Sequence, residues 1–209
     1  GNIYVGGTGK TPLSILLAKE LSKKNKKLAI IRRSYKTHID EYKFISDKFK
    51  NLIIKKDRVA AIKEAVAKQF DTVILDDGFQ DYRINKDINI LCFNKNQLIG
   101  NGQTFPSGPL RENLKAFKNT DIVMINGEED KVFEEKVFSM NKKIEIFYSS
   151  YNPVNINDFK GKKLMALAGI GNPENFFKII EENDLNLKKK IVYPDHYTFN
   201  KNEIIKILN

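Results

Sequence analysis

The sequence predicts an α/β protein, P-loop NTPase-like, with three layers: a mostly parallel sheet between two layers of helices. A second, smaller α/β lobe follows. Short apolar runs alternate with amphipathic stretches through residues 1–150, which form the expected nucleotide-binding domain. This alternation is typical of a parallel sheet that is covered on both faces. Residues 151–162 are rich in Asn, Pro and Asp and are expected to be a linker, and the pattern begins again in 163–209.

The expected elements follow the apolar pattern in order. Strands are expected at 3–5, 28–31, 52–54, 72–75, 88–93, 122–125, 144–148, 163–167 and 190–193. Helices are expected at 11–25, 40–49, 132–140 and 174–182, with a further helix capped by Asp57 and a last helix capped by Asn200. Glu203 stands in capping-box position after Asn200. The loop 96–111, rich in Gly and Pro, is long enough to indicate a function.

Residues 1–12, Gly-Asn-Ile-Tyr-Val-Gly-Gly-Thr-Gly-Lys-Thr-Pro, combine a strand end, a glycine turn and a helix start. This order is typical of a phosphate-binding loop, whose backbone N–H groups and helix N-terminus hold phosphates. Lys10 would reach the β- and γ-phosphates, and the Thr11 hydroxyl would ligate Mg²⁺. The nucleotide-binding residues are predicted to be Tyr4, Val5, Gly6, Gly7, Thr8, Gly9, Lys10 and Thr11.

The loop departs from the common pattern, because Tyr4 stands where the first glycine is usual. Val5 stands where the partitioning ATPases have a lysine, which argues against that group. The structural alternative is a glycine turn followed by a surface lysine.

Asp76 and Asp77 directly follow the apolar run 72–75. Acidic residues at the carboxyl end of a strand can hold Mg²⁺ directly or through water, and adjacent carboxylates are costly without a nearby cation. The alternative is a turn in which Asp accepts backbone hydrogen bonds. Arg111, in the long loop, could stabilise charge on a transferring phosphoryl group, or it could pair with Glu112 or another carboxylate.

Composition constrains the partners. The net charge is +10, from 36 basic and 26 acidic residues, which suits an anionic partner, but the lysines are spread over every expected helix. No Arg-rich tract or basic strand with interleaved aromatic residues is present, so no nucleic-acid partner is expected. The single cysteine, Cys92, lies in an apolar run and excludes a disulfide framework, which favours a reducing compartment. No apolar run is long enough to cross a bilayer.

Several motifs together resemble those of the tetraacyldisaccharide 4'-kinases, the lipid A 4'-kinases, and they occur in the family order along the chain. The motifs are Gly1-Asn2 with residues 6–12, Asp76-Asp77-Gly78-Phe79-Gln80, Gly100-Asn101-Gly102, Gly108-Pro109-Leu110-Arg111-Glu112, Ala168-Gly169-Ile170-Gly171-Asn172-Pro173 with Phe176-Phe177, and Pro194-Asp195-His196.

The resemblance implies transfer of phosphate from ATP, with Mg²⁺, to the 4'-hydroxyl of a lipid A disaccharide 1-phosphate. It implies a peripheral enzyme on the cytoplasmic face of the inner membrane of a Gram-negative bacterium. The family also carries an amphipathic or hydrophobic segment before the phosphate loop, through which it would meet an anionic membrane surface. Because the chain begins within the loop motif, we expect it to be a fragment without that segment and without the C-terminal end.

The resemblance also suggests roles for individual residues. It implies Asp40 as the catalytic base together with His196, and Glu41 as a magnesium ligand beside Thr11 and Asp77. From residues and resemblance together, the catalytic residues are expected to be Asp40, His196, Lys10, Asp76 and Arg111, and the substrate-binding residues Arg33, Tyr35, Gln80 and Arg111.

This chain departs from the family motifs at several positions. The family motif Ser-Arg-Gly-Tyr falls on Arg32-Arg33-Ser34-Tyr35, and Gly-Asp-Glu-Pro falls on Ile39-Asp40-Glu41-Tyr42 after an unusually short stretch. Asp81 replaces the usual His after Gln80. From spacing alone, Asp40 and Glu41 could also be a helix cap and a residue favoured by the helix dipole.

The alternative from another class is a nucleotide-switched P-loop ATPase or GTPase whose output is partner binding. No Asn-Lys-x-Asp motif for reading guanine is found; Asn94-Lys95-Asn96 lacks the Asp. Nucleotide turnover that rises only with a lipid acceptor would favour the kinase.

Overall fold

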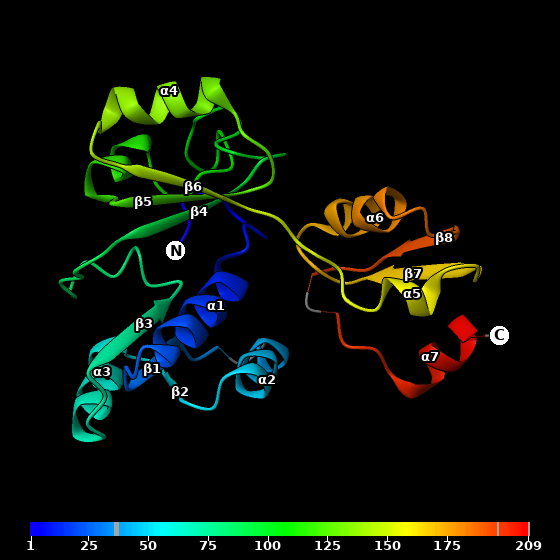
Figure 1. The fold of residues 1–209 in the computed structure, drawn as a ribbon, viewed down its shortest axis with the longest axis horizontal. Coiled ribbons are helices and arrows are strands. Elements are labelled where there is room, and N and C mark those ends of the chain that lie inside the picture. Colours follow the sequence, from blue (N-terminus) through cyan, green and yellow to red (C-terminus); the bar gives the residue numbers. More distant parts are fainter. Residues whose placement is uncertain (36–37, 196, 209) are drawn as a thin grey trace. The chain divides into compact units, whose positions relative to one another are not determined.

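The computed structural model describes residues 1–35, 38–195 and 197–208, and divides the chain into two compact units (Figure 1). The first unit spans Gly1–Ser150 and the second Tyr151–Asn209. Among the described residues, no helix is both long and apolar enough to cross a membrane.

The first unit is an α/β structure with parallel strands, as predicted. Its strands are β1 (Leu28–Arg33), β2 (Leu52–Lys55), β3 (Thr72–Asp76), β4 (Ile90–Asn94), β5 (Ile122–Asn126) and β6 (Glu145–Ser149). Its helices are α1 (Lys10–Lys23), α2 (Ile39–Lys48), α3 (Arg58–Ala67), α4 (Lys131–Met140) and a 3₁₀ helix, η1 (Leu114–Asn119). The strands form two parallel sheets, with orders β2-β1-β3 and β4-β5-β6.

Strand β1 is covered by helices on both faces, because alternate residues of a strand point to opposite sides. Leu28 and Ile30 pack in one core cluster with Ile15 and Ala18 of α1 and Ile45 of α2. The other face packs in a separate cluster, made of Ala29, Ile31, Ile53, Ala61 and Ala65. The predicted three-layer arrangement is therefore confirmed around β1.

The second sheet of this unit has its own aromatic core. Phe93 of β4 is fully buried and lies 5.7 Å from the ring of Phe117 in η1 and 5.1 Å from that of Phe133 in α4, between ring centroids. Cys92 is buried, as expected of a core residue. The sequence did not indicate η1.

Residues 3–5 do not form the expected strand. The start of the chain instead makes backbone contacts with β4 and with Leu110. The Gly1 nitrogen lies 2.9 Å from the Ile90 carbonyl oxygen, and the Cys92 N–H donates to the Gly1 carbonyl at 2.9 Å, so residue 1 lies along β4. Tyr4 then forms an isolated antiparallel bridge with Leu110. No longer strand forms here because the backbone turns at Gly6, whose φ of 101° lies outside the strand region.

The second unit is smaller. It contains α5 (Ile156–Phe159), β7 (Leu164–Ala168), α6 (Pro173–Glu182), β8 (Leu187–Val192) and α7 (Lys201–Leu208), with β7 and β8 paired in parallel. Its core is Ala166, Ala168 and Phe177. The predicted capping box is confirmed, because the Asn200 side chain accepts from the Glu203 N–H and Glu203 accepts from the Asn200 N–H, both at 2.9 Å. The stretch 151–162, taken for a linker, contains α5.

Candidate active site

The glycine loop, residues 6–9, leads into α1. The first turn of this helix has no side-chain cap. Gly6 and Gly9 have φ values of 101° and 85°, which side chains would strain. Gly9 is the N-cap of α1, no side chain caps this end, and the first turn holds no acidic residue. The buried Thr8 Oγ1 has no hydrogen-bond partner among the described residues. An open helix N-terminus and an unpartnered buried hydroxyl suit an anionic ligand such as a phosphate.

The long loop 96–111 holds the glycine loop in place. The Val5 N–H donates to the Pro109 carbonyl at 3.0 Å, and the Arg111 N–H donates to the Ile3 carbonyl at 2.7 Å. Gly108 must be a glycine here, since a Cβ atom would lie 2.4 Å from the Gln103 carbonyl oxygen. The loop thereby brings Arg111 next to the residues that follow β3.

Arg111 pairs with Asp77. Its Nη1 lies 3.3 and 3.2 Å from the two carboxylate oxygens of Asp77. Burial would raise the pKa of Asp77, but the positive charges of Lys10 and Arg111 hold this pKa below its ordinary value. Arg111 thus pairs with a carboxylate, which was one of the two roles considered for it. Both Arg111 and Lys10 place a positive charge near Asp77.

Asp76 is fully buried and faces α1. The Thr11 hydroxyl donates to Asp76 Oδ2 at 3.0 Å, and the Ser14 hydroxyl donates to Oδ1 at 3.3 Å. The predicted magnesium ligands are Thr11, Glu41 and Asp77. The structure instead brings Asp76 to Thr11, while Asp77 faces Arg111.

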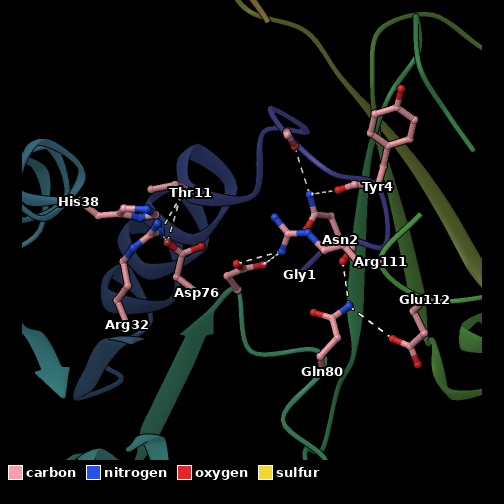
Figure 2. A network of polar contacts seen from close by, with 12 residues as sticks. Gly1, Asn2, Tyr4, Thr11, Arg32, His38, Asp76, Gln80, Arg111 and Glu112 are labelled. Atoms are coloured by element: carbon pink, nitrogen blue, oxygen red, sulfur yellow. Dashed lines mark hydrogen bonds and ion pairs between the residues drawn. The ribbon is translucent and has the colours of Figure 1, made fainter. Parts of the chain in front are cut away.

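Arg32 was missed from the sequence and lies at the centre of this group (Figure 2). It is the partner of Asp76 in the register of β1 and β3, and its Nη1 makes an ion pair with Asp76. The same nitrogen donates to Thr11 Oγ1 at 3.1 Å, and Nη2 makes an ion pair with Glu41. The signal that could have found it is the alternation along β1, which puts Arg32 on the α1 face with Leu28 and Ile30.

The start of α2 supports the loop that carries Arg33 and Tyr35. The Tyr42 hydroxyl lies 3.2 Å from the Arg33 carbonyl oxygen and 3.1 Å from that of Tyr35, and it accepts a hydrogen bond from the Tyr35 N–H. The Arg33 guanidinium lies 5.6 Å from the centre of the exposed Tyr35 ring. His38 Nδ1 lies 3.1 Å from Glu41.

Asp40 is exposed in the first turn of α2, next to Glu41 in the sequence. The N-cap of α2 is His38 and makes no side-chain capping hydrogen bond, so the alternative that Asp40 is the cap is wrong. The helix begins at Ile39, two residues earlier than a cap at Asp40 would require. His196, the expected partner of Asp40, lies outside the described residues.

Gln80 and Asp81 both contact the protein itself. Gln80 Nε2 donates to the Asn2 carbonyl at 2.9 Å and lies 3.4 Å from Glu112. Asp81, which stands in place of the usual His, is bound by both Nε and Nη2 of Arg83 at 2.9 Å and lies 3.7 Å from Arg58. Asp81 is thus part of a local ion-pair cluster.

A cavity of about 700 Å³ lies in the first unit and is lined mainly by polar residues, among them Arg83, Lys86 and Lys143. None of the residues predicted for the site lines it.

The oxygen atoms at and around Asp76 are of the type that Mg²⁺ prefers as ligands. Mg²⁺ prefers hard oxygen donors and usually takes only one or two carboxylates, with water and substrate phosphates completing its shell. Thr11 and Asp76 offer a hydroxyl and a carboxylate 3.0 Å apart beside the open N-terminus of α1. Within the described residues, no cluster of three or more His, Cys, Asp or Glu side chains could hold a metal by itself.

We expect the ion pair of Arg111 and Asp77 to contribute a pH-dependent part of the stability. Because the folded pKa of Asp77 is lowered, its ionised form is favoured by folding, and this contribution is complete above its ordinary pKa of about 4. It is lost as the pH falls through the lower, folded value. Arg111→Gln should therefore lower the free energy of unfolding at pH 7, and the difference from the unmodified protein should shrink below about pH 4.

Urea unfolding at a series of pH values measures this difference. The matched control is the same substitution in an Asp77→Asn background, where the effect of Arg111→Gln should no longer depend on pH. A difference that stays constant with pH in the unmodified background contradicts the prediction.

This chain matches known proteins over its whole length. The family model described as Tetraacyldisaccharide-1-P 4'-kinase matches residues 1–51 and 40–209. The tetraacyldisaccharide 4'-kinase of Pelagibacter ubique (strain HTCC1062) is 39% identical over 214 residues, covering 100% of this chain and 67% of its own length. That of Ruthia magnifica subsp. Calyptogena magnifica is 31% identical over 231 residues, covering 98% and 70%. That of Francisella tularensis subsp. novicida (strain U112) is 34% identical over 238 residues, covering 97% and 72%.

The two overlapping segments of the family match together span both units, and each of the three relatives covers at least 97% of this chain at 31–39% identity. The chain therefore belongs to the Tetraacyldisaccharide-1-P 4'-kinase family.

Proposed function

We propose that this protein transfers the γ-phosphate of ATP to the 4'-hydroxyl of a tetraacyldisaccharide 1-phosphate, a precursor of lipid A. The observation that carries the proposal is the hydrogen bond from Thr11, at the start of α1, to Asp76, at the carboxyl end of β3. This arrangement is typical of phosphoryl-transfer sites in P-loop proteins. Family membership supplies the substrate class.

In this proposal the ATP phosphates lie against the open N-terminus of α1. Backbone N–H groups of the glycine loop and Lys10 hold the β- and γ-phosphates, and Thr8 can donate its hydroxyl. Thr11 and Asp76, with Glu41 nearby, would hold Mg²⁺, which neutralises charge on the phosphates when it is bound. Phosphoryl transfer needs mainly positioning and charge stabilisation.

Arg111 and Asp77 form a second element of the mechanism. Arg111 is only about one-third exposed and is held by Asp77 close to the charge of Lys10. We propose that Arg111 stabilises the charge that develops on the transferring phosphoryl group, and that Asp77 fixes its orientation. Arg33 and Tyr35, on the loop held by Tyr42, are proposed to bind the acceptor.

The proposed base is Asp40, with His196 as its partner. A sugar hydroxyl is a weak nucleophile, so a positioned base should help. The exposure of Asp40 and its place next to Glu41 support a role toward an incoming acceptor.

We further propose that the protein works on the cytoplasmic face of the inner membrane and binds an anionic membrane surface peripherally. The acceptor is a lipid by the family's name, and the net charge of +10 favours attraction to anionic lipids.

Lys10→Ala should lower phosphoryl transfer by about 10²–10³-fold without unfolding the protein, because one positive contact to the transferring group is lost. The measurement is transfer from labelled ATP to the lipid acceptor, with circular dichroism to follow the fold. Lys19→Ala, an exposed lysine on the same helix, is the matched control and should keep full activity.

A folded Lys10→Ala variant with near-normal transfer would overturn the nucleotide assignment. ATP turnover that is independent of the lipid acceptor would favour the nucleotide-switched binding protein instead.

Asp40→Asn should lower the transfer rate by about 10²–10⁴-fold and leave ATP affinity unchanged, because Asn cannot accept the proton. ATP binding and transfer are measured separately. Asp47→Asn, exposed near the other end of α2, controls for loss of one negative charge on this helix. Unchanged transfer in Asp40→Asn would overturn its role as the base. A loss of transfer in Asp76→Asn or Asp77→Asn would not identify another base, because these residues are proposed to hold Mg²⁺ and Arg111.

Membrane attachment can be tested by sedimentation with vesicles. The protein should bind vesicles that contain phosphatidylglycerol at low ionic strength and should dissociate at about 1 M salt, where the Debye length is only about 3 Å. Neutral phosphatidylcholine vesicles serve as the control. Binding that is equal on both kinds of vesicle and insensitive to salt would contradict an electrostatic surface.

A further inference from the structure

Arg32 is a buried cation, and arginine side chains are rarely buried unless they are paired. Its side chain is only 4% exposed and extends from the carboxyl end of β1. Its two terminal nitrogens reach oxygens from three other elements: Thr11 of α1, Asp76 of β3 and Glu41 of α2. A guanidinium with its fixed fork of donors is suited to gather several oxygens in this way.

The same three oxygens are the ones that the proposed metal site would use. Thr11 Oγ1 donates its proton to Asp76 and accepts from Arg32, so its lone pair faces the guanidinium. Asp76 Oδ2 receives both Thr11 and Arg32, and Oδ1 receives Ser14. A divalent cation that ligates Thr11 and Asp76 must take the place of these Arg32 contacts.

Electrostatics also opposes the presence of both cations. A guanidinium and a divalent ion that share the same carboxylate oxygens would lie a few ångströms apart, where repulsion is strong in a buried site. The single positive charge of Arg32 also offsets part of the negative charge of Asp76 and Glu41, which would otherwise attract the metal.

The Arg32 side chain is held mainly at its tip. Its buried Nε atom has no hydrogen-bond partner among the described residues, and its contacts with Thr11, Asp76 and Glu41 are made by the terminal nitrogens. Replacement of those contacts by a metal would therefore remove the hydrogen bonds and ion pairs that the guanidinium makes with Thr11, Asp76 and Glu41.

We propose that Arg32 is an internal cation that competes with the divalent metal for Thr11, Asp76 and Glu41, and so sets the metal affinity of the site. This inference rests on the proposed use of Mg²⁺. It assigns to Arg32 a specificity-determining role: metal binding requires the guanidinium to leave these oxygens.

The test is direct binding of Mn²⁺ to the whole protein without nucleotide, followed by electron paramagnetic resonance of the free ion. Arg32→Ser should bind Mn²⁺ at least about tenfold more tightly than the unmodified protein, because the competing charge is gone. Arg32→Lys keeps a positive charge at the site and should stay within a few-fold of the unmodified protein.

The matched control is Arg33→Ser, which removes the same charge one residue further on, from the opposite face of β1. It should change Mn²⁺ affinity by less than about twofold. A gain in Arg33→Ser equal to that in Arg32→Ser would show a general charge effect and overturn the proposal. Equal or weaker binding by Arg32→Ser would overturn it as well, because Arg32 would then organise the oxygens for the metal.

A second measurement covers loss of stability in Arg32→Ser. Ligands that bind only the folded state raise the melting temperature, so Mg²⁺ should raise that of Arg32→Ser more than that of the unmodified protein. An Arg32→Ser protein that unfolds and is not restored by Mg²⁺ would contradict the proposal. Neither measurement uses the lipid acceptor, so failure of the proposed kinase reaction would be seen separately, in the transfer assay.

Discussion

The arrangement of the site depends on the buried ion pair between Arg32 and Asp76. Desolvating two charges is expensive, and the cost is offset only when their remaining hydrogen-bonding groups are satisfied. Here Thr11 and Ser14 satisfy Asp76, and Glu41 takes the second terminal nitrogen of Arg32, while Arg32 Nε has no partner among the described residues. Removal of one member of a buried pair typically costs about 3–5 kcal/mol. The pair therefore ties α1, α2, β1 and β3 together at the start of α1, where the glycine loop ends.

A second set of polar contacts fixes the other side of the glycine loop. The Asn2 side chain donates to the carbonyls of Tyr4 and Gly6, and Gln80 donates to the Asn2 backbone (Figure 2). Glu112 lies beside Gln80 and accepts from Tyr82. The neighbouring Asn2 side chain thus holds the start of the loop, and Gln80, from a distant part of the chain, holds the Asn2 backbone.

Much of the fold could be predicted from the sequence, because apolar alternation and the capping residues Asp57 and Asn200 are local signals. The glycine loop was recognised for the same reason. The partners of Arg32 and the pairing of Tyr4 with Leu110 could not be predicted, since they depend on strand register and on loop closure. Adjacent aspartates give no local sign of which one faces α1, and the register of β1 and β3 decides it for Asp76.

The start of α2 has a mechanical consequence. Two successive residues attach it to different partners: Glu41 to Arg32 in the interior, and the Tyr42 hydroxyl to the backbone of Arg33 and Tyr35 at the surface. A rigid rotation of α2 would stretch both attachments at once. The first turn of this helix therefore joins the buried charges to the surface loop by polar contacts, in addition to the packing of Ile45 in the hydrophobic core.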